Sequence, residues 1–167
     1  MNMIREILKT IDEYEGGYSN RPGDLGGLTR YGISHKAYPH VDIANLTKEQ
    51  AITIAIDDYW NKLRCSEIIS CRVRWKVFDI GFNGGVSTAA RMLQHAVRVK
   101  EDGVVGQETL AAVNRQTNSS IGEIQILTSL IEQQMTRYVN IVSCDHSQLE
   151  NLKGWARRAF DPGRNLS

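Results

Sequence analysis

The apolar residues near the start of the chain recur at the spacing of an α-helix. They are Met3, Ile4, Ile7, Leu8, Ile11 and Tyr14, and most charged residues of this stretch fall on the opposite side. This pattern predicts an amphipathic helix over residues 3–14. The glycines of Glu15-Gly16-Gly17 propagate a helix poorly and favour its termination, so Glu15 is expected in the last turn.

The following stretch, residues 18–33, loses the helical period. It carries Pro22-Gly23 and Gly26-Gly27 among polar residues, with short segments at Tyr18 and at residues 28–31 that could pair. Prolines and glycines at such spacing are typical of tight turns. We therefore predict a small β-hairpin excursion here.

Helical spacing returns at Thr47 and continues to about Trp60. Thr47 and Gln50 have the spacing of a capping box, in which each side chain bonds the other residue's backbone amide. Two further helices are predicted at residues 73–82, closed by Gly84-Gly85, and at residues 88–97, with Ser87 as the N-terminal cap.

The last third of the chain predicts three more helices. They cover residues 107–114, a long segment that begins near Ser120, and residues 148–160. Ser120 and Glu123 have the spacing of a second capping box. The apolar stripe expected to face the core is Ile124, Leu127, Ile131, Met135, Tyr138 and Val142.

No segment repeats and no Pro/Ser/Gly-rich linker divides the 167 residues. This length suits one domain with a substantial core. The predicted fold class is mainly α, with the β excursion near residues 18–33 at the edge of one compact unit.

Composition and charge exclude several classes of function. The chain is 41% hydrophobic and 23% charged, which is typical of a globular protein, and its net charge of +1 predicts no nucleic-acid surface. The three cysteines indicate neither a disulfide framework nor a zinc site, so we expect free thiols. The four histidines show no paired spacing typical of zinc ligands, so we expect no metal and no cofactor. No apolar run is long enough for an integral membrane segment, and residues 1–10 lack the apolar core of a signal peptide, which predicts synthesis in the cytoplasm.

The segment from Glu15 to Ser34 contains three polar residues with catalytic potential, namely Glu15, Asp24 and Thr29. Glycoside hydrolysis needs a protonated carboxylic acid at the leaving oxygen and a second group that attacks or positions water. The partial negative charge at a helix C-terminus raises the proton affinity of a nearby carboxylate, which favours Glu15 as the acid. Because these residue types also favour turns, the spacing alone leaves an ordinary surface loop as an alternative.

The segment resembles the signature of glycoside hydrolase family 108, phage-type N-acetylmuramidases that have been called secretion activators. That signature is an EGGY motif followed by D-x-GG-x-T-x-x-GI, and both motifs are present, at residues 15–18 and 24–33. The resemblance implies a lysozyme-like fold with Glu15 as catalytic acid and Asp24 and Thr29 as its companions.

The second half resembles the predicted peptidoglycan-binding region of the same family. The matching segments are residues 79–85, Leu93-Gln94, residues 102–106 with Thr109-Leu110, and Gly154-Trp155. The expected division is a muramidase catalytic region at 1–70 and a helical peptidoglycan-binding region at 71–167. Tyr31 offers a flat face for a sugar ring, and Asn83 offers an amide for sugar hydroxyl or N-acetyl groups, although an Asn before two glycines is also a common helix cap.

The resemblance implies a peptidoglycan hydrolase that cuts the β-1,4 bond between N-acetylmuramic acid and N-acetylglucosamine. Peptidoglycan glycan strands are then its partner, and it would act in the periplasm with a holin or another export helper. Two alternatives stay open: a lytic transglycosylase, and a non-catalytic peptidoglycan-binding or secretion-assembly protein.

Overall fold

The computed structural model describes residues 3–14, 18–19 and 28–161. Its α-helices are α1 (Met3–Tyr14), α2 (Lys48–Ala55), α3 (Cys71–Gly84), α4 (Val86–Val97), α5 (Gln107–Gln116), α6 (Ser120–Cys144) and α7 (Leu149–Ala159). Short helical turns are η1 (Ile43–Asn45), η2 (Ile56–Trp60), η3 (Cys65–Glu67) and η4 (His146–Gln148). The strands β1 (Tyr18–Ser19), β2 (Thr29–Arg30) and β3 (Ile33–Ser34) form one antiparallel sheet in that order. The mainly α class with a small β excursion is confirmed.

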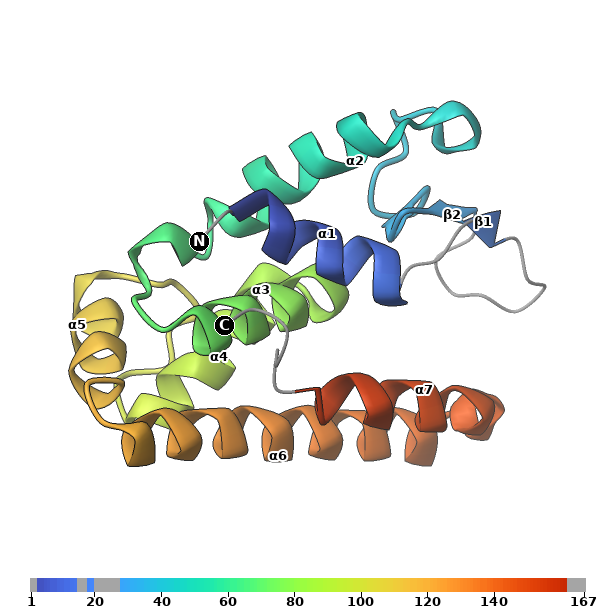
Figure 1. The fold of residues 1–167 in the computed structure, drawn as a ribbon. Helices are drawn as coiled ribbons and strands as arrows, with labels where there is room; N and C mark the ends of the chain where they lie inside the picture. The colour runs from blue at the N-terminus through green and yellow to red at the C-terminus, as the bar shows by residue number, and fades with distance from the viewer. Residues whose placement is uncertain (1–2, 15–17, 20–27, 162–167) are drawn as a thin grey trace.

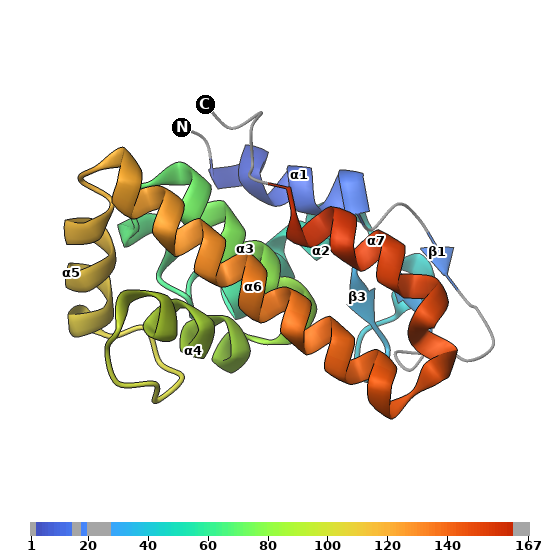
Figure 2. The ribbon, with the colours of Figure 1, turned by 90° about the horizontal axis from the view of Figure 1, so that it is seen from below.

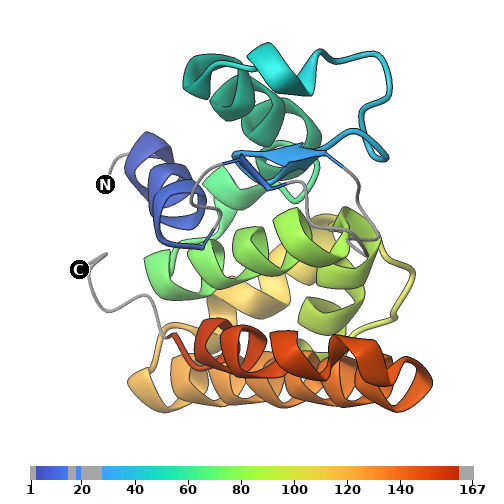
Figure 3. The ribbon, with the colours of Figure 1, turned by 90° about the vertical axis from the view of Figure 1, so that its right-hand side faces the viewer.

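Helix α3 runs through the middle of the molecule. Nearly every side chain from Val73 to Phe82 is buried, so this helix has no solvated face and must be covered on all sides. In Figures 1 and 3, α2 and the sheet lie on one side of α3, and α6 and α7 lie on the other. The small sheet is therefore separated from the C-terminal helices by the central helix.

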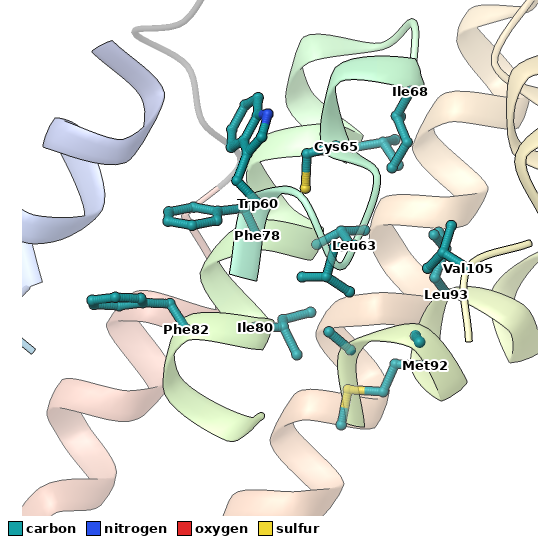
Figure 4. Packing of buried hydrophobic residues seen from close by; sticks show 14 of the residues in the cluster. Trp60, Leu63, Cys65, Ile68, Phe78, Ile80, Phe82, Met92, Leu93 and Val105 are labelled. Carbon is teal, nitrogen blue, oxygen red and sulfur yellow. The ribbon is translucent and has the colours of Figure 1, made fainter. Parts of the chain in front are cut away.

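Aromatic rings join the π-helical turn η2 to α3. The Trp60 and Phe78 ring centroids are 5.5 Å apart, and Phe78 stacks on Phe82 at 5.7 Å. Figure 4 shows these rings on one side of α3, with Leu63 and Ile80 on the other. One continuous cluster of buried apolar residues extends from α1 to α6.

Helices α6 and α7 form an antiparallel pair beneath α3 (Figure 2). The fully buried Lys76 donates from Nζ to the backbone oxygens of Arg158, at 3.0 Å, and Ala159, at 2.7 Å. Arg158 donates from Nε to Asp79 Oδ1 at 2.9 Å. Because the last carbonyls of a helix lack partners within it, these contacts cap α7 and attach it to α3.

Three local predictions can be judged directly. Thr47 and Gln50 form both bonds of the predicted capping box. Ser87 is not the cap of α4, because Gly85, with φ +95°, immediately precedes that helix. The predicted capping box at Ser120 and Glu123 is also wrong, since Ser119 caps α6 by accepting from Gly122 N–H at 3.0 Å.

The face of α6 that meets the core is rotated from the predicted stripe. Leu127 and Tyr138 are buried as expected, whereas Ile124 is 55% exposed. The fully covered positions are Ile126, Leu130 and Gln134 instead. The reason is that α6 packs against three helices, α3, α4 and α7, so its apolar surface is shared among several directions.

Candidate active site

Two buried polar contacts fix α1 against α3. Arg74 donates through Nε to Glu6 Oε2 at 3.0 Å and through a second nitrogen to Oε1, and the Glu6 side chain is fully buried. One turn further along α1, Thr10 Oγ1 accepts a 3.1 Å hydrogen bond from Trp75 Nε1. Charged and polar groups at such depth require partners, so these contacts fix the position of α1 on α3. Glu15 follows the last residue of α1 in the sequence but lies outside the described residues, as does Asp24.

Thr29 lies on the central strand of the sheet. Its Cα is paired with Ser19 on β1 and with Ser34 on β3. Residues directly opposite in an antiparallel pair project to the same face, so Thr29 and Ser34 share one face of the sheet. Strands β2 and β3 are closed by a 2.9 Å bond from His35 N–H to Leu28 O. The predicted catalytic threonine thus has a backbone supported on both sides.

Tyr31 and Gly32 form the two-residue turn between β2 and β3, with φ values of 53° and 76°. Two left-handed residues are the signature of the type I′ turn, which matches the twist of the strands. Glycine and asparagine suit this conformation, whereas a bulky residue is strained in it. The Tyr31 ring compensates by packing against the core and lying 5.3 Å from the Arg30 guanidinium carbon, and Arg30 itself donates to Ala44 O on η1.

Asn83 is the penultimate residue of α3 and is exposed. Its Nδ2 donates to Asp79 O at 2.7 Å, one turn back along the same helix. Within the described residues its amide oxygen makes no hydrogen bond. The side chain therefore supports the helix end and keeps an acceptor available to a ligand.

The structure reveals a polar pocket that sequence reasoning missed. A hollow of about 300 Å³ lies between Tyr38, the turn η2 and Val86 at the start of α4. Asp58 Oδ2 accepts from the Tyr38 hydroxyl at 3.0 Å, and Oδ1 contacts Lys62 Nζ at 2.6 Å. The Lys62 hydrogen bond, followed by that of Tyr38, lowers the pKa of Asp58, so this carboxylate is ionised at neutral pH.

The pocket is adjacent to the end of α3, because Tyr59 in its wall makes an edge contact with Phe82 at 5.1 Å. Burial is the largest cause that raises the pKa of Tyr38, which therefore keeps its proton and donates. An ionised carboxylate beside an ammonium group can hydrogen-bond sugar hydroxyls. No local sequence signal marked this pocket, because η2 contains a π-type bond from Asn61 N–H to Ile56 O that shifts the register of Asp58 and Tyr59.

No metal-binding cluster of three or more His, Cys, Asp or Glu side chains occurs in the part of the chain that the structure describes. In the same part, no helix is long and apolar enough to cross a membrane.

Comparison with known families assigns the two halves of the chain. The family model "Glycosyl hydrolase 108" matches residues 8–85. These residues are thus assigned to glycosyl hydrolase family 108. The model "Predicted Peptidoglycan domain" matches residues 88–160. The two matches meet at the glycines that end α3, and together they support a peptidoglycan hydrolase.

The structure of Brucella abortus SagA is similar to that of this chain. The TM-score is 0.73 at 26% sequence identity, and the match covers 93% of this chain and 92% of that one. The lysozyme-like, mainly α fold is thus shared over nearly the whole length. No curated protein matches the chain.

Proposed function

We propose that this protein is an N-acetylmuramidase, a lysozyme that cuts the β-1,4 bond between N-acetylmuramic acid and N-acetylglucosamine. The observation that carries the proposal is the family 108 match over residues 8–85, which contains both signature motifs. The catalytic region is assigned to residues 1–70 and the wall-binding region to residues 71–167. Its substrate lies in the periplasm, where we infer that it acts.

Glu15 is the general acid in this proposal. It gives its proton to the glycosidic oxygen as the bond to the anomeric carbon breaks, and Asp24, with Thr29, attacks or positions a water on the other face of the sugar. Support comes from the helix that precedes Glu15, since the buried contacts of Glu6 and Thr10 hold α1 on α3 and limit the movement of its end. A proton donor is effective only when its position relative to the substrate is fixed. Tyr31, and Asn83 with its available amide oxygen, are assigned to substrate binding.

The test is Glu15→Gln, with Glu13→Gln as a matched control that makes the same chemical change two residues earlier. An amide cannot deliver a proton, so the rate of release of soluble fragments from purified sacculi should fall by about 10²–10⁴-fold in Glu15→Gln and stay near the wild-type rate in Glu13→Gln. A folded Glu15→Gln variant with undiminished activity would refute the assignment.

Mass spectrometry of the wild-type products separates the two enzymatic alternatives. A muramidase adds water and leaves a reducing end, whereas a lytic transglycosylase leaves an anhydro end lighter by one water. Binding of wild-type protein to sacculi with no release of fragments would instead identify a non-catalytic wall-binding or assembly protein.

A further inference from the structure

A groove of about 750 Å³ lies outside the candidate active site, where the C-terminal half of α6 meets α4 and η4. Residues 92–148 supply its whole lining, which falls within the segment matched as a predicted peptidoglycan domain. Met92 and Ile141 contribute apolar surface, and Gln133 joins the two helices by donating to Met92 O at 3.0 Å. The groove therefore has a fixed floor and belongs to the wall-binding half.

The shape of the groove suits a short extended chain. Its α6 residues, from Gln133 through Arg137 and Asn140 to Cys144, recur at intervals of three or four and so share one face of the helix. The eleven helical steps from Gln133 to Cys144 extend about 16 Å. A peptide of four or five residues has the same length when extended, at about 3.3–3.6 Å per residue.

The lining of the groove contains one positively charged side chain, Arg137, and two carboxylates. Arg137 extends over the end of α3, since a Cβ built on Gly84 would lie 3.8 Å from the guanidinium carbon. In the described part of the chain no carboxylate pairs with that guanidinium. Glu132 and Asp145 add carboxylates to the same groove. An occupant that complements this lining carries both a carboxylate and an amino group, with small apolar side chains between them.

We propose that this groove binds the stem peptide of peptidoglycan, the short peptide carried by its muramic acid residues. The proposal rests on the proposed function, because peptidoglycan is taken as the substrate. Stem peptides combine free carboxylates, an amino group and alanine methyl groups, which match Arg137, the Glu132 and Asp145 carboxylates, and the apolar Met92 and Ile141. Because Arg137 lies beside Gly84, the groove is close to Asn83. One glycan strand can then bind with its sugars in the active site and its stem peptide in the groove.

The test compares Arg137→Glu with Arg115→Glu. The control reverses a charge on the exposed face of α5, away from the groove. Both are made also in the Glu15→Gln background, so that binding is measured without cleavage. The probes are a free stem tripeptide of alanine, γ-linked glutamate and a diamino acid, intact sacculi, and glycan strands from which an amidase has removed the peptides.

Arg137→Glu should weaken binding of the tripeptide by about tenfold or more, the loss expected for a charge-assisted hydrogen bond, whereas Arg115→Glu should bind like wild type. In the active protein, Arg137→Glu should lower the rate on intact sacculi relative to that on stripped strands. A second variant, Asn140→Trp, should obstruct the groove and give the same losses.

Equal tripeptide affinity in wild type and in both groove variants would overturn the proposal, as would a tripeptide that does not bind wild type. Dimerisation of wild type that Asn140→Trp abolishes would also overturn it, by identifying a second copy as the occupant. Failure of the proposed function has a different signature, because wild type would then release nothing from either sacculi or stripped strands while tripeptide binding was still measurable.

Discussion

The left-handed backbone of Tyr31 costs free energy that a glycine or asparagine would not cost. For an L-residue with a large side chain the penalty is about 1–2 kcal/mol. Its ring recovers a comparable amount through partial burial against the core and its contact with the Arg30 guanidinium. A strained aromatic residue in the signature segment suggests that the ring has a task beyond folding.

Replacing Tyr31 tests that task. Tyr31→Asn removes the backbone strain and the ring together, so the free energy of unfolding should change by less than about 1 kcal/mol in urea denaturation. If the ring stacks on a sugar, KM for glycan strands should rise several-fold. Tyr31→Phe keeps the ring and should keep both values. A variant that loses stability but retains its KM would show that the ring serves the fold alone.

At the scale of elements, α5 and the start of α6 approach each other closely at Gly122. A Cβ on Gly122 would lie 2.1 Å from the backbone oxygen of Gln116, which ends α5. Only a residue without a side chain fits there. Gly154, in the middle of α7, is exposed, and a Cβ on it would meet nothing within 4 Å.

The same substitution should therefore have opposite effects at these two glycines. Gly122→Ala should destabilise the protein by about 1–3 kcal/mol, because backbone atoms have to move apart. Gly154→Ala should stabilise it by about 0.5–1 kcal/mol, because alanine loses less conformational entropy in a helix. Chemical denaturation of both variants measures the two values. Equal shifts of one sign would contradict the close contact between Gly122 and Gln116.

The two predicted capping boxes differ in whether residues close in the sequence decide the helix cap. The Thr47 box forms because its two residues are free to bond each other. Glu123 has the same spacing from Ser120, but its carboxylate accepts from Ser70 Oγ at 2.5 Å and from Arg72 Nη1 at 3.1 Å. Ser70 is itself the cap of α3, so a contact between distant helices replaces the local one. The spacing of residues along the sequence does not show that Ser70 and Arg72 compete for the Glu123 carboxylate.

At the scale of the whole molecule, several carboxylates make stability depend on pH. Hydrogen bonds lower the pKa of Asp58, of Glu67 through Arg64, and of Asp102 through the Gln94 side chain and the Val104 amide. A carboxylate with a lowered pKa stabilises the folded state above its unfolded pKa, and this contribution is lost as the pH falls through the folded value. The unfolded values are close to 3.8 for Asp and 4.5 for Glu.

We therefore expect a Tm that varies little between about pH 7 and pH 5 and falls below about pH 4. Thermal unfolding followed by circular dichroism across this range measures it. Asp102→Asn should fall less steeply than wild type, because one of the titrating groups is gone. A wild-type Tm unchanged at about pH 3 would contradict the assigned hydrogen bonds.

The sequence by itself predicted the helices, the small β excursion and the resemblance to family 108. Helical periodicity, the turn-rich stretch and the Thr47 cap depend on residues a few positions apart, and the two signature motifs are contiguous, so all of them can be recognised without tertiary contacts. The roles of Glu15 and Asp24 stay predictions, because both lie outside the described residues.

Only the tertiary structure decided which surfaces meet. The buried face of α6 differs from the predicted stripe, and Glu123 bonds residues of α3 and its cap instead of Ser120. Glu6 and Arg74 join α1 to α3. The pocket around Asp58 and the groove around Arg137 are both formed by segments far apart in the chain. These features depend on the burial of particular side chains against distant neighbours. The free energy of such contacts depends on distances in space, which spacing along the chain does not contain.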